Sequence, residues 1–394
     1  MFYEVLIGAL ALALGVAVGR LGATRRASAI QEQRAAEGLA YIRGVNFLLS
    51  GDPQKAIDEF IKAVQVNSET VEAYLVLGNL LRSQGDAARA IRLHQGVICR
   101  PGVSKEVLVQ AFCELGLDYR ECGMLDKARD AFQEAVKRDP KQLKAWVWLQ
   151  EVLEELGNWE EALRTRERIS KLQRTVDSNV VAHLLVELGK AKWAEGDLKA
   201  AKSSLKKAIS SHEACVDAYL HLGDLYAEEG DDSKAVGTWK KVLDVAPAFT
   251  FLAYGRLEHA YYRLGQISAL EELLRQHSDG DPFSGLFLAR HLRKKGELRE
   301  SARILEGIVQ DRPGWKQVRK ELIHLYAEQG QYDRALAHCQ AMLTTCEDSG
   351  YVFQCEACGR QSTELTWRCP GCRRWDTIRP REASLEHVQG AGEG

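Results

Sequence analysis

Residues 109–142 read VQAFCELGLDYRECGMLDKARDAFQEAVKRDPKQ, which is two short amphipathic patterns on either side of a glycine. The first pattern repeats apolar residues at three- and four-residue spacing, with Phe112, Leu115 and Tyr119 on one stripe. This spacing predicts a helix with one apolar face. Gly123 is expected to end that helix, because a residue without a Cβ adopts the left-handed C-cap conformation at little cost.

The second pattern predicts another helix, and Pro140 closes it. Its apolar stripe consists of Ala128, Ala131, Phe132, Ala135 and Val136. The small alanines let the two helices approach closely, and Phe132 is expected to fill the space between them. Two such helices cannot bury both apolar faces alone, so neighbouring copies are expected to stack on them.

The turn glycine recurs along the chain at intervals of 31 to 39 residues. The nine turn glycines are Gly51, Gly85, Gly123, Gly157, Gly196, Gly230, Gly265, Gly296 and Gly330. In most copies a second glycine precedes the turn by seven residues, or an alanine follows it by five. This is the tetratricopeptide pattern. The sequence therefore predicts an all-α superhelix of about nine repeats over residues 37–348.

A stacked array of this kind has a concave face lined by the first helix of each repeat. We interpret that face as a groove for an extended peptide or a partner helix. The candidate partner contacts are Arg82, Arg120, Trp193, Tyr262, Arg290 and Arg293. Trp193 and Tyr262 are the preferred anchors, because aromatic side chains dominate binding hot spots. The competing interpretation is that these positions are only a solvated polar surface.

Two C-x-x-C pairs, separated by ten residues, lie in the segment 351–380. Their cysteines are Cys355, Cys358, Cys369 and Cys372. This spacing predicts a closed tetrahedral site in which four cysteines hold one metal ion, zinc first and iron as the alternative. Gly359 and Gly371 are expected to supply the tight turns of the two pairs. A pair of redox motifs is the rival interpretation, but it would require a strand–helix context that this segment lacks.

Thr363, Leu365 and Trp367 alternate with polar residues, which predicts a short strand. Trp367 and Trp375 are assigned to the interior of the small domain rather than to a binding platform. A unit this short cannot fold on apolar burial alone. The metal ion is therefore expected to supply folding free energy.

Charge argues against a nucleic-acid partner. The whole chain balances 53 Lys and Arg against 55 Asp and Glu. The cysteine segment carries six arginines and three carboxylates between residues 351 and 381. Four thiolates and one Zn²⁺ reduce its net charge to roughly +1, a weak footprint for nucleic acid. A ribbon that docks on protein is therefore favoured.

The N-terminal residues 2–19, FYEVLIGALALALGVAVG, carry a single charge, Glu4. Eighteen helical residues extend about 27 Å, close to the hydrocarbon thickness of a bilayer. A cleaved signal peptide would need positive charge before the apolar run, and none is present. Residues 1–20 are therefore predicted to be an uncleaved transmembrane anchor.

Positive charge follows the apolar run instead of preceding it, at Arg20, Arg25, Arg26, Arg34 and Arg43. This asymmetry places the bulk of the chain on the cytoplasmic side of the membrane. Residues 21–36 are predicted to be a juxtamembrane linker, and residues 381–394 a flexible tail.

The chain has no phosphate-binding glycine loop, no H-E-x-x-H and no nucleophile elbow. The ten histidines are scattered. A metal ion that is fully ligated by four cysteines has no open position for water, so it is not expected to catalyse a reaction. The prediction is a protein without enzymatic activity.

An anchor, nine repeats and a ribbon with C-x-x-C-G and C-P-x-C-x-x-W-D, in that order, resemble the lipopolysaccharide assembly protein B family. That family belongs to the inner membrane of Gram-negative bacteria. The resemblance implies a rubredoxin-like ribbon that packs against the repeats, with the four cysteines as metal ligands. It also implies an adaptor that brings the deacetylase LpxC to the membrane protease FtsH for degradation.

Further inner-membrane regulators or lipopolysaccharide synthesis enzymes are implied as partners by the same resemblance. The alternative function is a general membrane-bound assembly scaffold for lipopolysaccharide synthesis or for other envelope complexes. The sequence leaves open a homo-oligomer, the surface that binds each partner, and the choice between a peptide and a helix in the groove.

Overall fold

The computed structural model describes residues 31, 35–36, 38–66, 71–278, 280–344 and 352–381. The predicted anchor, nearly all of the predicted linker and the tail beyond residue 381 lie outside the described residues. The chain divides into two compact units, Met1–Thr175 and Val176–Gly394, and each is described by itself.

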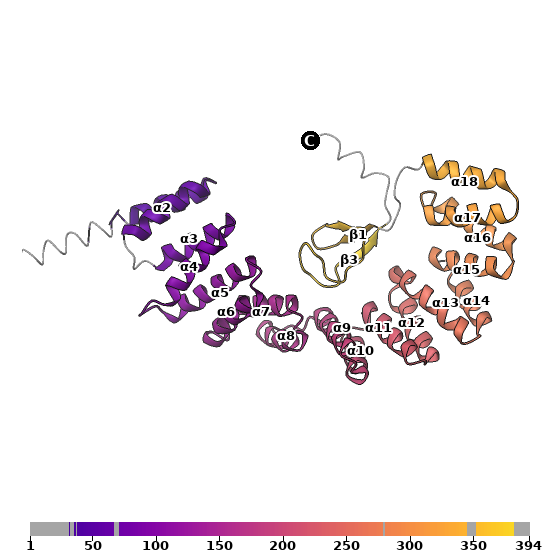
Figure 1. Cartoon of the computed structure of the whole chain (residues 1–394), viewed down its shortest axis with the longest axis horizontal. Coiled ribbons are helices and arrows are strands. Elements are labelled where there is room, and N and C mark those ends of the chain that lie inside the picture. Colours follow the sequence, from indigo (N-terminus) through magenta and orange to yellow (C-terminus); the bar gives the residue numbers. More distant parts are fainter. Residues whose placement is uncertain are drawn as a thin grey trace, which may run out of the picture. The chain divides into compact units, whose positions relative to one another are not determined.

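The first unit is built from helices (Figure 1). Residues 38–49 are helical. They are followed by α2 (Pro53–Val66), α3 (Val71–Ser83), α4 (Ala87–Ile98), α5 (Lys105–Glu121), α6 (Leu125–Arg138), α7 (Leu143–Glu155) and α8 (Trp159–Gln173). Consecutive helices pack on one another along this series, as stacked helix pairs must.

The second unit continues the series and adds a small sheet (Figure 1). Its first helices are α9 (Ser178–Ala194), α10 (Leu198–Ser211), α11 (Val216–Glu228), α12 (Asp232–Val245), the 3-10 helix η1 (Pro247–Phe249) and α13 (Phe251–Arg263). They are followed by α14 (Ile267–His277), α15 (Pro282–Lys295), α16 (Leu298–Asp311), α17 (Lys316–Glu328) and α18 (Tyr332–Thr344). The predicted all-α repeat fold is confirmed for the described residues.

The turn glycines behave as the repeat pattern predicts. All nine adopt a positive φ, between 66° and 88°. At the turn between α5 and α6, the Gly123 N–H donates to Arg120 O (2.9 Å) and the Met124 N–H donates to Tyr119 O (2.8 Å). These bonds satisfy carbonyl groups that the end of α5 would otherwise leave without a partner.

Five of the nine turns have a second glycine seven residues earlier, and this glycine has a different role. A Cβ on Gly116 would lie 2.6 Å from the Phe132 ring, which is fully buried between α5 and α6. A Cβ on Gly78 would lie 2.4 Å from the ring of His94 in α4. The glycine therefore makes room for the bulky side chain of the second helix, as the sequence indicated for Phe132.

The C-terminal ribbon consists of β1 (Val352–Cys355), β2 (Gln361–Ser362) and β3 (Ile378–Arg381). They form an antiparallel sheet in the order β2-β1-β3, with Phe353 opposite both Ser362 and Pro380. The predicted strand from Thr363 to Trp367 is wrong, because β2 ends at Ser362. Leu365 and Trp367 pack instead against the apolar core formed by α11 to α15.

Candidate metal centre and partner-binding surface

The first cysteine pair lies on a tight loop that begins at the end of β1. Cys355 is fully buried and Cys358 is exposed. The Gly359 N–H donates to Cys355 O at 2.8 Å, and Gly359 has a φ of +75°. The positive φ requires a residue such as glycine, so this predicted turn is present.

The second pair repeats this geometry with one difference. The Arg373 N–H donates to Cys369 O at 2.8 Å, and Arg373 itself has a φ of +59°. The positive φ therefore falls on the residue after Cys372, whereas the sequence assigned the turn to Gly371. Gly371 instead lets the Arg360 side chain pack close to the backbone, because a Cβ there would lie 2.9 Å from Arg360 Cδ.

The four sulfur atoms all lie within 4.8 Å of one another. Cys355 Sγ is 3.6 Å from Cys372 Sγ, and Cys358 Sγ is 3.7 Å from Cys369 Sγ. A tetrahedral zinc ion with Zn–S bonds of about 2.3 Å separates its sulfurs by about 3.8 Å, whereas a disulfide requires about 2.05 Å. The donor set therefore fits one metal ion, and zinc is the expected one.

Hydrogen bonds to Cys355 and Cys369 favour the thiolate form that metals bind, whereas burial and the neighbouring cysteines raise the pKa of Cys372 to about 11. The Thr377 hydroxyl lies 3.2 Å from Cys355 Sγ, and this hydrogen bond lowers the pKa of the Cys355 thiol to about 6. The Gly371 N–H donates to Cys369 Sγ at 3.4 Å. With four protein sulfurs the coordination sphere is closed, so the metal ion would hold the fold of the ribbon rather than activate water.

The two indoles of the ribbon lie against the repeats. Trp367 is 5.4 Å from Phe249 of η1, between ring centroids, and Trp375 is stacked on His183 of α9 at 5.2 Å. The assignment of both tryptophans to the ribbon's own interior is therefore wrong. The ribbon is too small to enclose two indoles. Its buried hydrophobic residues are Phe353, Cys355, Cys369 and Ile378.

His183 is a buried residue of this interface that the sequence analysis did not single out. It is 1% exposed, and neither ring nitrogen has a hydrogen-bond partner among the described residues. The Asp376 carboxylate lies between two imidazoles, 3.9 Å from His183 Nε2 and 3.9 Å from His212 Nε2. Burial lowers the pKa of His183, while the carboxylates of Asp217 and Asp376 partly oppose this shift. The sequence offered one indication of this buried role, a polar residue inside the apolar run VVAHLLV.

We expect the protein to lose thermal stability as the pH falls below about 6.5, and more so than the variant His183→Phe. The unfolded chain takes up a proton at a pKa of about 6.5, whereas the pKa of folded His183 is lower. This part of the stability is therefore complete above about pH 6.5 and is lost as the pH falls below it. The measurement is the melting temperature at several pH values.

The phenylalanine of that variant keeps an aromatic ring against Trp375 and removes only the titrating group. Subtracting its profile also removes the acid sensitivity of the metal site, which both proteins share. His324→Phe, at an exposed position on α17, is the matched control and should retain the wild-type profile. Equal profiles for the wild type and His183→Phe would contradict the prediction.

The arginines predicted to line the groove bridge successive repeats. They are Arg82, Arg120, Arg290 and Arg293. Arg120 of α5 contacts Glu151 (2.6 Å) and Glu155 (2.7 Å) of α7. Arg290 of α15 contacts Glu321 of α17 at 2.8 Å. These ion pairs join the first helices of neighbouring repeats, and a role of the arginines in partner binding stays a prediction.

A buried polar network in the first unit was also not predicted from the sequence. His94 Nδ1 lies 2.5 Å from Asp118 Oδ2, and both side chains are fully buried. Arg82 donates to the other oxygen of Asp118 at 2.7 Å and to Glu114 at 2.7 Å. His94 occupies the position that Phe132 fills in the next repeat, four residues after the small alanine of its helix. His94 therefore places a polar ring where the next repeat has an apolar one, between α3 and α4, and its contact with Asp118 joins α4 to α5.

The two predicted aromatic anchors differ in accessibility. Trp193 of α9 is half-buried and lies edge-on to His221 of α11, with 6.4 Å between ring centroids. Tyr262 of α13 is 38% exposed and lines a pocket together with Ile267. Of the two, Tyr262 is the more available to a partner, and both remain predicted contacts.

Comparison with known proteins supports both parts of this description. A family model described as rubredoxin metal binding domain matches residues 353–380. Models described as tetratricopeptide repeat match residues 43–99, 120–185 and 186–248. Lipopolysaccharide assembly protein B of Escherichia coli (strain K12) is 28% identical over 377 residues, which cover 90% of this chain and 93% of the relative.

The protein of the same name from Haemophilus influenzae is 27% identical over 390 residues, covering 94% of this chain and 96% of the relative. The resemblance to the lipopolysaccharide assembly protein B family is confirmed. Among solved structures, YrrB, described as a TPR protein with an unusual peptide-binding site, is 24% identical. It covers 50% of this chain and 97% of its own, with a TM-score of 0.34. MamA is 24% identical over 43% of this chain and 93% of its own, with a TM-score of 0.31.

The tetratricopeptide matches and the relatives named lipopolysaccharide assembly protein B indicate a non-enzymatic protein. The predicted membrane anchor, residues 1–20, lies outside the described residues. Within the part of the chain that the structure describes, every helix is too short or too polar to cross a bilayer.

Proposed function

We propose that this protein is an inner-membrane adaptor without catalytic activity that regulates lipopolysaccharide synthesis. The observation that carries the proposal is the order of three parts in one chain: an apolar N-terminal segment, a repeat array and a four-cysteine ribbon. The similarity to proteins named lipopolysaccharide assembly protein B covers 90% of the chain.

In the proposed mechanism the protein acts by tethering. Residues 1–20 hold the array at the membrane, and the array holds the deacetylase LpxC close to the membrane protease FtsH. A tether of this kind raises the local concentration of a client to about the millimolar range without new chemistry. Cys355, Cys358, Cys369 and Cys372 would hold the metal ion, which fastens the ribbon whose indoles lie on α9 and η1.

Deletion of residues 1–20 tests the proposal. The shortened protein is expected to keep the melting temperature of the full chain and to lose the ability to lower the LpxC level in cells, measured by immunoblot. The matched control replaces residues 1–20 by an unrelated transmembrane helix, which should restore activity because tethering requires only an anchor.

Full activity of the soluble form would overturn tethering. An LpxC level that does not respond even to the full-length protein would overturn the role in proteolysis. If the full-length protein then co-purified with lipopolysaccharide synthesis enzymes, the result would favour the alternative of a general assembly scaffold.

A further inference from the structure

A pocket of about 490 Å³ lies at the ends of α13 and α15, next to the start of α14. Its lining residues are Tyr262, Ile267, His291, Lys294 and Lys295. Tyr262 is 38% exposed and Ile267 is 43% exposed, so two large hydrophobic side chains meet solvent in one concave place. Exposed apolar surface that is rimmed by polar groups is typical of an interaction site.

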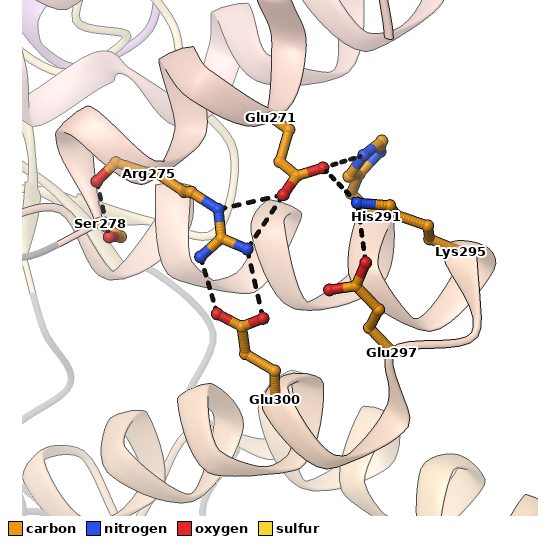
Figure 2. A network of polar contacts seen from close by, with 7 residues as sticks. All are labelled: Glu271, Arg275, Ser278, His291, Lys295, Glu297 and Glu300. Carbon is orange, nitrogen blue, oxygen red and sulfur yellow. Dashed lines mark hydrogen bonds and ion pairs between the residues drawn. The ribbon is translucent and has the colours of Figure 1, made fainter. Parts of the chain in front are cut away.

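The cationic side of this α13–α15 pocket is held in place by a polar network (Figure 2). The carboxylate of Glu271 on α14 accepts from Lys295 Nζ at 3.0 Å and from Arg275 Nη2 at 2.9 Å. Arg275 also donates to Glu300 of α16 at 2.7 Å, which ties the network to the next helix. Lys295 is therefore positioned by contacts on two sides, since it also pairs with Glu297 at 2.7 Å.

The mouth of the pocket presents positive charge to solvent. The Lys294 side chain is 60% exposed and the Lys295 side chain 50%, whereas their partners Glu258 and Glu271 are only 16% and 17% exposed. Lys294 Nζ also lies 5.3 Å from the centre of the Tyr262 ring. An ammonium group has three N–H donors, and Glu258 engages one of those of Lys294. Glu297, the second partner of Lys295, is 39% exposed, so the charge of Lys295 is matched at the surface. The Lys294 ammonium is therefore the solvent-facing cation of the mouth, and its partner Glu258 lies beneath it.

His291, in the wall of the pocket, is only weakly engaged by its neighbours. It is 3% exposed, and its Nε2 has no hydrogen-bond partner among the described residues. The nearest carboxylate oxygen, on Glu271, is 3.6 Å away, which is longer than a hydrogen bond. Its Nδ1 lies 3.4 Å from the hydroxyl of Tyr262. Buried polar atoms are usually satisfied, so a buried ring nitrogen with only this long contact to Glu271 leaves the pocket wall able to take a further acceptor (Figure 2).

We infer that the α13–α15 pocket binds a short segment of a partner protein in which an apolar side chain lies next to a carboxylate. The apolar side chain contacts Ile267 and the ring of Tyr262, and the carboxylate accepts from Lys294. Charge complementarity supports this choice, because the Lys294 ammonium is 60% exposed while its own partner Glu258 is only 16% exposed. The inference rests on the proposed adaptor function and deepens it by naming the kind of segment that is held.

The test uses the full-length protein in detergent and the octapeptide Gly-Ser-Glu-Leu-Glu-Gly-Ser-Gly as probe. A peptide that fills one pocket binds weakly, so titrations by saturation-transfer difference NMR extend to about 1 mM. Ile267→Glu is expected to weaken binding at least about tenfold, because a charge replaces the apolar wall. Met124→Glu, at a position with 44% exposure against 43% for Ile267, is the matched control and should bind like the wild type.

A charge swap tests the second half of the segment. Lys294→Glu should weaken binding of the acidic peptide about two- to fivefold, the range of an exposed ion pair, and improve binding of a peptide with Lys in place of Glu. Melting temperatures show whether each variant is folded. Equal affinity of Ile267→Glu and Met124→Glu, or no preference for acidic over basic peptide, would overturn the inference.

The two proposals fail separately. Peptide titration tests the pocket without cells, and deletion of residues 1–20 tests the adaptor function without altering the pocket. A pocket that binds no peptide therefore leaves tethering unaffected, and an active anchorless protein leaves the titration result unaffected.

Discussion

Cys369→Ser is expected to release the metal ion and to separate the ribbon from the repeats. Cys369 is fully buried, and its Sγ is one of four sulfurs that lie within 4.8 Å of one another. Binding of a structural zinc ion contributes about 10–16 kcal/mol in small zinc domains, far more than the few buried apolar residues of this ribbon supply. The measurements are the zinc content per chain and the tryptophan emission, which should shift to longer wavelength as Trp367 and Trp375 meet water.

Cys99→Ser is the matched control, because it makes the same chemical change at an exposed cysteine after α4. It should retain one metal ion per chain and the wild-type emission. Removal of the metal from the wild type by a chelator should reproduce the emission of Cys369→Ser, and added zinc should reverse it. A Cys369→Ser protein with full metal content and unchanged emission would refute the fastening role.

Features fixed by local chemistry were predictable from the sequence. The turn at Gly123 requires a positive φ, and this requirement depends only on residues within one helical turn. The pairing of Cys355 with Cys358 is likewise a matter of two residues between ligands. Both features can be predicted without knowledge of the fold. The turn glycine is the stronger prediction, because it recurs along the chain.

Features that depend on stacking could not be predicted in advance. Arg82 contacts Glu114 and Asp118, which lie 32 and 36 residues later and so meet it only when two repeats pack together. The sequence around Trp367 predicted a strand, because alternation of apolar and polar residues was the only local pattern. Its indole instead lies on Phe249, more than one hundred residues earlier in the chain. Long-range burial therefore overrode local alternation.

Asp118→Ala is expected to destabilise α4 and α5 by about 3–5 kcal/mol, the cost of breaking a buried ion pair by removing one partner. Asp118 is fully buried, and its carboxylate serves both Arg82 (2.7 Å) and His94 (2.5 Å). Its loss leaves a buried imidazole and a partly buried guanidinium without their shared acceptor. The measurement is the opening free energy of these two helices by hydrogen exchange, which reports local rather than global unfolding.

Two further variants separate charge from packing at this site. Asp126→Ala, on α6 with a side chain 74% exposed, should change the opening free energy by less than about 0.5 kcal/mol. The double variant His94→Phe and Asp118→Leu should recover most of the loss, because Phe132 fills the equivalent space in the next repeat and Gly78 leaves room for a ring. Arg82 would keep its pair with Glu114 at 2.7 Å. A small effect of Asp118→Ala would mean that apolar packing alone joins these repeats. A large effect that the double variant does not recover would mean that an apolar pair cannot replace the polar network.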